Sequence, residues 1–447
     1  MLNVMLAAIQ FVTVDPGHFH AALVQNRTYE GVSPDVLVYA PEGNELKSHL
    51  SLIDQFNTRA ANPTAWKETV YANPDFLKKF SEDAAKCSAA DNAKKIVVLA
   101  GRNNVKPDYY LAGVEAGLNV LSDKPMAITS ENYMKLCDAA AIAKEKGLFF
   151  GDIMTERNEI TTILQRELSR ASGVYGTQDV GSLDNPAVTK VSVHHFCKLV
   201  NGKPLRRPGW YYDTDQQGEA IVDVTTHLVD LVQWSLFPEQ TLKRSDVKML
   251  AARTWNTPIT AADYEKSTGI KEWPAYLKRS VDKDNVLQCK ANGEFTYTLR
   301  GVHAKVSVEW HFMPPAGTGD THYSLMRGSN SELVIRQGPA QGFKPVLYVK
   351  LREGADRAKT ETALNAALAK ICETYPGIKA VPANGEEEGA TWKIDVPKKY
   401  DIGHEAHFSQ VMQQFLGWMK AGKMPEMELR NLLVKYYTLT EAWKMSR

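Results

Sequence analysis

The sequence predicts an α/β protein that builds a doubly wound parallel sheet first and a larger, mostly antiparallel sheet after it. Up to about residue 151, short β-rich runs alternate with helical patterns, as in parallel strands joined by helices. From residue 294 onward, apolar and polar residues alternate along successive runs, which is typical of antiparallel strands with one covered face. With 447 residues, the chain is long enough for two or three domains.

The first region has the elements of a parallel sheet. Its expected strands are residues 11–14, 36–39, 96–100, 119–121 and 148–150. The run at 96–100 is apolar throughout, as in a central strand that is buried on both faces. The crossover helix after it begins at Lys106 and stops at Gly117. Residues 46–80 are long and polar for one crossover, so we expect extra helices there.

The second region begins with a helix near 159–171, a strand at 188–196 and a polar, aromatic loop at 198–217. Phe295, Tyr297 and Leu299 then share one face of a strand, and Val306 and Val308 share one face of the next. We expect an antiparallel meander that continues through residues 322–327, 331–336 and 346–351. A surface helix at 360–375, an acidic loop at 382–391 and closing helices at 404–419 and 428–445 follow. We therefore expect domains at residues 1–152 and 153–400, with 401–447 packing back as helices.

Composition excludes several classes of function. The 53 basic and 52 acidic residues nearly cancel, so no field of one sign is available to bind nucleic acid or an anionic membrane. The five cysteines lie far apart without a C-x-x-C pair, so they are expected to be reduced thiols. No run of eighteen apolar residues exists, and the first ten residues lack a basic leader pattern. We expect a cytoplasmic protein, or a periplasmic one if a leader has been trimmed.

The first strand runs into Asp15-Pro16-Gly17-His18-Phe19-His20, where a dinucleotide-binding protein would carry G-x-G-x-x-G. Only the middle glycine is present, as Gly17, and that is the position at which the backbone approaches the pyrophosphate. A rigid turn that binds no nucleotide is the alternative. At the end of the second strand, Glu42 occupies the place of a ribose-binding carboxylate, which favours NAD over NADP. A solvated loop glutamate explains Glu42 nearly as well.

Two further segments carry residues suited to proton and hydride chemistry. Lys124 follows a strand and precedes Pro125, so it is expected at the carboxyl edge of the sheet, where ligands bind. A surface lysine is the alternative. Asp223, His227 and Asp230 fall at i, i+4 and i+7 of an amphipathic stretch, which puts a carboxylate and an imidazole on one face. An Asp–His pair that only satisfies a buried core is the alternative.

The remaining candidates concern substrate and metal. Trp210, Tyr211 and Tyr212 lie in one loop with two arginines, a combination that suits a sugar ring or, equally, a subunit contact. His194 and His195 are neighbours on a strand, so only one of them is expected to face a pocket. His404-Glu-Ala-His407 is not H-E-x-x-H, and we expect no metal.

The chain resembles the glucose–fructose oxidoreductase, inositol dehydrogenase and MocA family (Gfo/Idh/MocA) over most of residues 11–240. The resemblance rests on the segment 112–127, with Asp123-Lys124-Pro125 near its end, and on the segment 218–230, from Gly218 to Asp230. It departs from the family at Asp15, which replaces the first glycine, at Asp123, which replaces glutamate, and at Thr225, which replaces glycine. The first departure puts the mode of cofactor binding in doubt.

The resemblance implies an N-terminal Rossmann domain and a C-terminal α/β domain with a large open sheet. It also implies that Lys124, Asp223 and His227 are catalytic, and it places Arg157 where the family often has an arginine. With the residue arguments above, the expected cofactor-binding residues are Asp15, Gly17, His18, Phe19, Glu42, Gly101, Asn103, Lys124 and Pro125. The expected substrate-binding residues are Arg157, His195, Trp210, Tyr211 and Tyr212.

The predicted function is an NAD-dependent sugar or polyol dehydrogenase, with NADP as the alternative cofactor. His227 would take the proton of a ring hydroxyl, Asp223 would orient the imidazole, and Lys124 would offset the alkoxide charge. Oxidation of a glycoside at C3 is the preferred version. The alternatives are an NAD-dependent glycoside hydrolase that oxidises the sugar transiently, and a non-catalytic sugar-binding relative. We expect a carbohydrate ligand and a homodimer or homotetramer formed through the open sheet.

Overall fold

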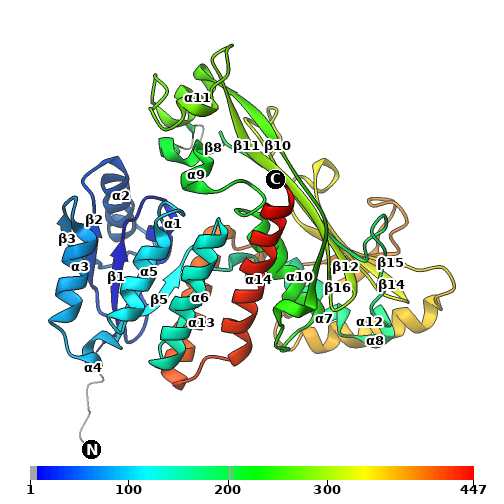
Figure 1. The fold of residues 1–447 in the computed structure, drawn as a ribbon. Helices are drawn as coiled ribbons and strands as arrows, with labels where there is room; N and C mark the ends of the chain where they lie inside the picture. Colours follow the sequence, from blue (N-terminus) through cyan, green and yellow to red (C-terminus); the bar gives the residue numbers. More distant parts are fainter. Residues whose placement is uncertain (1–7, 201–202, 205) are drawn as a thin grey trace, which may run out of the picture. The chain divides into compact units, whose positions relative to one another are not determined.

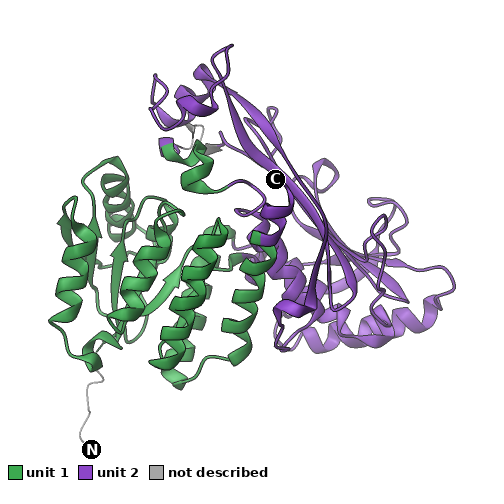
Figure 2. Cartoon of the chain, viewed as in Figure 1, with its two compact units in different colours: residues 1–155, 210–218, 403–440 green, residues 156–209, 219–402, 441–447 purple. Residues whose placement is uncertain are grey.

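The computed structural model describes residues 8–200, 203–204 and 206–447. The start of the chain that was weighed as a leader, residues 1–7, lies outside the described residues. The chain forms two compact units (Figure 2). Unit 1 contains residues 1–155, 210–218 and 403–440, and unit 2 contains residues 156–209, 219–402 and 441–447.

Unit 1 is built on a six-stranded parallel sheet with the strand order β3-β2-β1-β4-β5-β6 (Figure 1). The strands are β1 Gln10–Val14, β2 Asp35–Ala40, β3 Lys67–Ala72, β4 Lys95–Leu99, β5 Asn119–Ser122 and β6 Phe150–Asp152. All five strands predicted for this region are confirmed. The side chains of β4 from Ile96 to Leu99 are at most 1% exposed, because helices cover both faces of the sheet.

The helices of unit 1 divide between the two faces of the sheet. They are α1 His20–Leu23, α2 Asn44–Thr58, α3 Phe76–Ala85, α4 Ala89–Asn92, α5 Lys106–Glu115, α6 Ser130–Glu145, α9 Thr214–Gln217, α13 His404–Ala421 and α14 Glu426–Met445, whose last residues belong to unit 2. On one face, Ile53 of α2 and Met412 of α13 pack in the core with Phe11. On the other, Gly113 lets α5 approach Val97 closely, since a Cβ there would lie 3.3 Å from the valine Cγ2.

Strand β3 was not predicted. It is one of the two edge strands of the sheet, and among the described residues it pairs with β2 on one side. Most of its side chains are exposed or half-buried, so its sequence lacks the apolar run of an internal strand. The helices expected on either side of it are present as α2 and α3.

Unit 2 is built on a nine-stranded sheet with the order β10-β11-β12-β7-β13-β14-β15-β17-β16. The strands are β7 Val188–His195, β10 Val247–Thr260, β11 Val286–Leu299, β12 Val302–His311, β13 Thr321–Arg327, β14 Ser331–Gln337, β15 Val346–Leu351, β16 Lys379–Pro382 and β17 Trp392–Asp395. A two-stranded sheet is formed by β8 Leu199–Val200 and β9 Lys203–Pro204. The predicted meander is confirmed except at one place, where β7 inserts between β12 and β13 and pairs with β12 in parallel.

The helices of unit 2 are α7 Ile160–Ser169, α8 Ser172–Tyr175, α10 Thr225–Leu236, α11 Ala261–Thr268 and α12 Arg357–Ile371. The prediction that the Asp223 segment opens a helix needs a correction. Helix α10 begins at Thr225, and Asp223 lies in the preceding turn, where its carbonyl accepts a hydrogen bond from the Thr226 N–H. The aspartate is therefore not in the regular helix that carries His227.

One face of the nine-stranded sheet carries charged side chains over β10, β11 and β12. Glu294 Oε1 lies 2.7 Å from Arg253 Nε, and Glu294 Oε2 lies 3.0 Å from Lys305 Nζ. The alternate residues, such as Phe295 and Val306, are buried on the opposite face. Over these three strands the exposed face carries ion pairs, and the oligomer expected through the open sheet stays a prediction.

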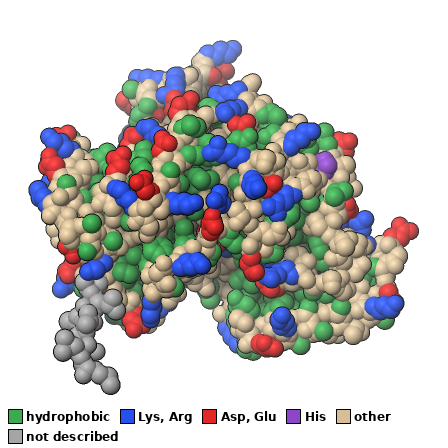
Figure 3. Space-filling view, turned by 60° about the horizontal axis from the view of Figure 1, so that its bottom comes forward, with side chains coloured by type: hydrophobic (Ala, Val, Ile, Leu, Met, Phe, Trp, Pro, Cys, Tyr) green, Lys and Arg blue, Asp and Glu red, His purple; other side chains and the backbone are tan. Residues whose placement is uncertain are grey.

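Within the described residues, no helix is both long and apolar enough to cross a membrane. On the face drawn in Figure 3, basic and acidic side chains are interspersed. This distribution agrees with the near-zero net charge of the sequence.

Candidate functional site

The turn after β1 explains how an aspartate replaces the first fingerprint glycine. Asp15 has φ +46°, in the left-handed region that glycine adopts freely and that aspartate tolerates better than most residues. Its buried carboxylate accepts a hydrogen bond from the Tyr109 hydroxyl at 3.2 Å. Burial raises the pKa of Asp15, although the nearby Arg102 guanidinium and the Tyr109 hydroxyl act against this. The turn therefore has the backbone conformation of the fingerprint without its glycine.

Two glycines let the ends of β1 and β4 meet. A Cβ on Gly101 would lie 2.3 Å from the Asp15 carbonyl oxygen, so no larger residue fits there. A Cβ on Gly17 would lie 3.3 Å from the Gly101 Cα and 3.3 Å from Trp210 Cζ2. The His18 N–H donates to the Ala100 carbonyl at 2.7 Å and fixes the turn to β4. This close approach at the carboxyl ends of parallel strands fits the pyrophosphate of a dinucleotide.

The predicted substrate loop belongs to unit 1. The N–H groups of Asn103 and Asn104 donate to the Gln216 carbonyl at 2.9 and 3.1 Å. The side chain of Arg102 lies over the Trp210 ring, 5.6 Å from its centroid, and donates to Gln216 Oε1 at 3.1 Å. The segment 210–218 is thus held against the loop that follows β4, beside Gly17.

The aromatic residues of this segment adjoin the dinucleotide turn. The ring of Tyr211 is nearly parallel to that of His18, with centroids 6.0 Å apart. Trp210, Tyr211 and Tyr212 are all buried within the chain. Trp210 and Tyr211 thus lie beside Gly17 and His18, and the role of all three residues in substrate binding stays a prediction.

Around Lys124, the end of β5 is firmly tied to its neighbours. The buried Lys106 ammonium donates to the carbonyls of Asp123 and Pro125 at 2.9 and 3.1 Å. The Lys124–Pro125 peptide bond is cis. Burial acts to raise the pKa of Asp123, but the charges of His20, Lys106 and Lys124 outweigh burial and hold the pKa well below its ordinary value.

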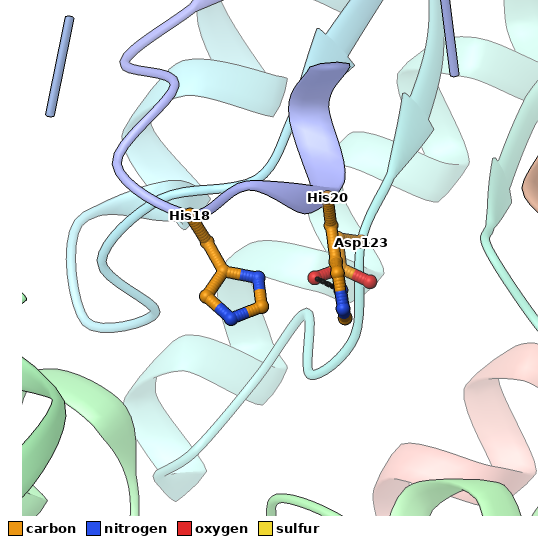
Figure 4. Close-up of side chains that lie close together, drawn as sticks. All are labelled: His18, His20 and Asp123. Carbon is orange, nitrogen blue, oxygen red and sulfur yellow. Dashed lines mark hydrogen bonds and ion pairs between the residues drawn. The ribbon is translucent and has the colours of Figure 1, made fainter. Parts of the chain in front are cut away.

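Sequence reasoning missed His20 and its contact with Asp123 at this end of the sheet. His20 Nδ1 lies 2.9 Å from Asp123 Oδ2, and His18, His20 and Asp123 form one cluster (Figure 4). The H-x-H spacing was the available signal, but only the fold shows that Asp123 is its neighbour.

Near the end of β2, Glu42 is exposed, whereas Glu45 lies 3.7 Å from Arg102.

In unit 2, the turn before α10 and the helix itself carry the other predicted catalytic residues. Asp223 is buried and His227 is half-buried. Asp230 accepts two hydrogen bonds from Arg157, at 2.6 and 2.8 Å, so the predicted substrate-binding arginine is engaged by this helix. Since Lys124 belongs to unit 1, its convergence with Asp223 and His227 stays a prediction.

The two neighbouring histidines of β7 meet one carboxylate. His194 and His195 present Nδ1 to the two oxygens of Asp320, at 3.2 and 2.9 Å. Burial acts to raise the pKa of Asp320, but His194 and Lys198 outweigh burial and lower it well below its ordinary value. The carboxylate at the end of β7 is thus within reach of both histidines, and the expectation that only one of them faces a pocket stays a prediction.

The comparisons with known proteins agree with this architecture. The family model described as "Putative oxidoreductase C terminal domain" matches residues 164–447. The crystal structure of a "putative oxidoreductase" from Parabacteroides merdae is 48% identical, with a TM-score of 0.93 and 98% of both chains covered. No protein among the curated ones matches the sequence.

More distant structures share the fold alone. A "putative oxidoreductase" from Erwinia carotovora atroseptica is 12% identical, with a TM-score of 0.60 over 98% of this chain and 99% of that chain. A 3-ketoreductase from Actinomadura kijaniata, solved in complex with NADP and TDP-benzene, is 13% identical, with a TM-score of 0.55 over 97% of this chain and 96% of that chain. The family model matches the C-terminal region of this chain, and the structure from Parabacteroides merdae is similar to it along its whole length. The chain therefore belongs to the oxidoreductase family described by the "Putative oxidoreductase C terminal domain" model.

Proposed function

We propose that the protein is a nicotinamide-dependent dehydrogenase of the Gfo/Idh/MocA type that oxidises a secondary hydroxyl of a sugar or polyol, in glycosides at C3. The observation that carries the proposal is the arrangement in unit 1, where the Gly17–Gly101 approach and Lys124, two residues after the end of β5, share the carboxyl edge of one parallel sheet. Ligands of open α/β sheets bind at this edge. The 3-ketoreductase of the same fold, solved with NADP, supports a nicotinamide cofactor.

The residues present fit such a cofactor. Gly17 and Gly101 let the turn after β1 pack closely against the end of β4, at the edge of the sheet where a pyrophosphate binds, and Arg102 and Lys124 supply positive charge at that edge. We propose NAD rather than NADP, because the exposed Glu42, which closely follows β2, would repel a 2′-phosphate. The bound cofactor accepts the hydride, and the protein positions the reacting groups.

The remaining chemistry falls to three side chains. His227 removes the hydroxyl proton, and Asp223 orients the imidazole and stabilises its charged form. Lys124 stabilises the developing alkoxide. The half-buried position of His227 and the burial of Asp223 suit a proton acceptor that must be partly shielded from water.

The proposal is tested with NAD⁺ and an aryl glucoside, following both the absorbance of reduced nicotinamide and the release of the coloured aglycone. We expect reduced nicotinamide to form, and Lys124→Met to lower turnover by roughly 100-fold to 10,000-fold while the chain stays folded. The control is Lys135→Met, which removes a half-exposed lysine of α6 in the same unit and should leave turnover unchanged.

Two outcomes would contradict the proposal. Full activity in Lys124→Met would remove the proposed role of the ammonium. Aglycone release without any reduced nicotinamide would favour a hydrolase that oxidises its substrate transiently.

A further inference from the structure

The cluster of His18, His20 and Asp123 has no assigned role in the proposed hydride transfer. Each of the three residues offers one nitrogen or oxygen atom that lies within 4.8 Å of the other two. Figure 4 shows the imidazole of His18 extending from the turn before α1, and that of His20, from the first residue of α1, lying beside the carboxylate of Asp123. The cluster combines two segments about a hundred residues apart in the sequence.

The spacing of these atoms is close to that of metal ligands. Two ligands held at right angles, each about 2.1 Å from an ion, lie about 3.0 Å apart. His20 Nδ1 and Asp123 Oδ2 are 2.9 Å apart, so a metal ion could replace the proton that they share without separating them. The ring of His18 has its centroid 4.0 Å from that of His20, so a small approach of His18 completes the set.

The backbones that carry these side chains are fixed to consecutive residues of one strand end. The Asp123 N–H donates to the Leu99 carbonyl at 2.7 Å, and the His18 N–H donates to the Ala100 carbonyl at 2.7 Å. Lys106 holds the Asp123 carbonyl at 2.9 Å. Ligands mounted on such fixed backbone lose little freedom when a metal binds, and this favours binding.

We propose that His18, His20 and Asp123 bind one divalent transition metal ion. Two imidazoles and one carboxylate form the ligand set of facial-triad sites, and three protein ligands leave positions open to water or to an oxygen of the bound ligand. The ammonium groups of Lys106 and Lys124 act on Asp123 and oppose any cation. The site therefore selects ions that bond strongly to imidazole, such as Zn²⁺, Co²⁺ or Fe²⁺, over Mg²⁺ and Ca²⁺.

The test uses the full chain, stripped of metal with a chelator and titrated with Co²⁺. We expect one ion per chain, detected by calorimetry and by the visible absorption bands of protein-bound Co²⁺. In His20→Gln and in Asp123→Asn, which keep the side-chain size, the affinity should fall by at least about 100-fold. A residue that only supports a metal ligand through a hydrogen bond lowers the metal affinity by about 10–100-fold when it is replaced, so a larger loss indicates a ligand. The control is His311→Gln, an exposed histidine of β12, which should bind as the unchanged chain does.

Two results would overturn the proposal: no uptake of Co²⁺ by the unchanged chain, or equal uptake in Asp123→Asn and the unchanged chain. Circular dichroism of each variant shows whether it is folded. The Co²⁺ spectrum of the unchanged chain tests the proposal even if a variant does not fold. NAD binding to the metal-free chain is measured separately. Failure of the metal site is therefore distinguishable from failure of the proposed dehydrogenase.

Discussion

Two lysines show how differently the two units bury a positive charge. In unit 1, Lys435 of α14 lies 2.8 Å from Asp152 of β6, with the side chains 1% and 6% exposed, and the Tyr436 hydroxyl donates to the same carboxylate. In unit 2, Lys190 is also completely buried, on β7, but its two side-chain acceptors are neutral. It donates to Ser324 Oγ at 2.7 Å and to Gln165 Oε1 at 3.3 Å.

The difference teaches what a charged partner contributes inside a protein. Burial lowers the pKa of Lys190 to about 7. A neutral hydroxyl and amide offset only part of the cost of removing an ammonium from water. The carboxylate beside Lys435 attracts the ammonium directly, so removing either partner leaves an uncompensated charge. The fold of unit 1 thus depends on Lys435, whereas unit 2 buries Lys190 at a cost in stability.

The largest effect is expected from Lys435→Met. The substitution leaves the buried Asp152 carboxylate with the Tyr436 hydroxyl but without its cation, so the free energy of unfolding should fall by about 3–5 kcal/mol. Urea denaturation measures the change. Lys78→Met, which breaks an exposed pair in α3 of the same unit, should change the free energy by less than about 1 kcal/mol. Similar values for the two variants would break the comparison.

Lys190→Met should act in the opposite direction and should depend on pH. Between about pH 7 and pH 10.5 the unfolded chain keeps the proton that folded Lys190 has lost, so the contribution of Lys190 to stability rises with pH. Its cost is largest below pH 7 and disappears as the pH passes the unfolded pKa. From pH 7 to pH 9, the unchanged chain should gain about 2 kcal/mol relative to the variant. Parallel stability curves would show that Lys190 keeps its proton.

Asp15→Ala extends the comparison to a buried carboxylate of unit 1. Alanine in the left-handed turn lowers the free energy of unfolding by about 1 kcal/mol or more. Loss of the acceptor of the Tyr109 hydroxyl lowers it by about 1 kcal/mol more. The melting temperature should therefore fall, with a loss of about 2 kcal/mol. Asp15→Asn tolerates the same backbone and keeps an acceptor, so it should lose clearly less. If asparagine and alanine behave alike, the conformation of the turn is not what selects aspartate.

Much of the fold could be predicted, because internal strands such as β4 are apolar on both faces and their sequences show it. The edge strands β3 and β10 were missed, since each pairs on one side only and mixes polar with apolar residues. The place of β7 between β12 and β13 was also missed, because strand pairing across more than a hundred residues leaves no local pattern.

Site residues could be predicted from the sequence where a position directly after a strand calls for one type of residue. Gly17 and Lys124 could be chosen from their place after a strand. The proximity of Asp123 to His20, and of Trp210 to Gly17, depends on contacts between distant segments. The replacement of the first glycine by Asp15 could be understood only once its positive φ was known.

The most direct test of the central claim follows the hydrogen itself. The protein is loaded with NAD⁺ and mixed with a glycoside that carries deuterium on C3, and the nicotinamide is analysed by mass spectrometry after one turnover. The proposed function predicts that the reduced cofactor contains one deuterium. Reduced cofactor without deuterium would contradict transfer from C3, and the absence of any reduction with a range of sugars and polyols would contradict the dehydrogenase itself.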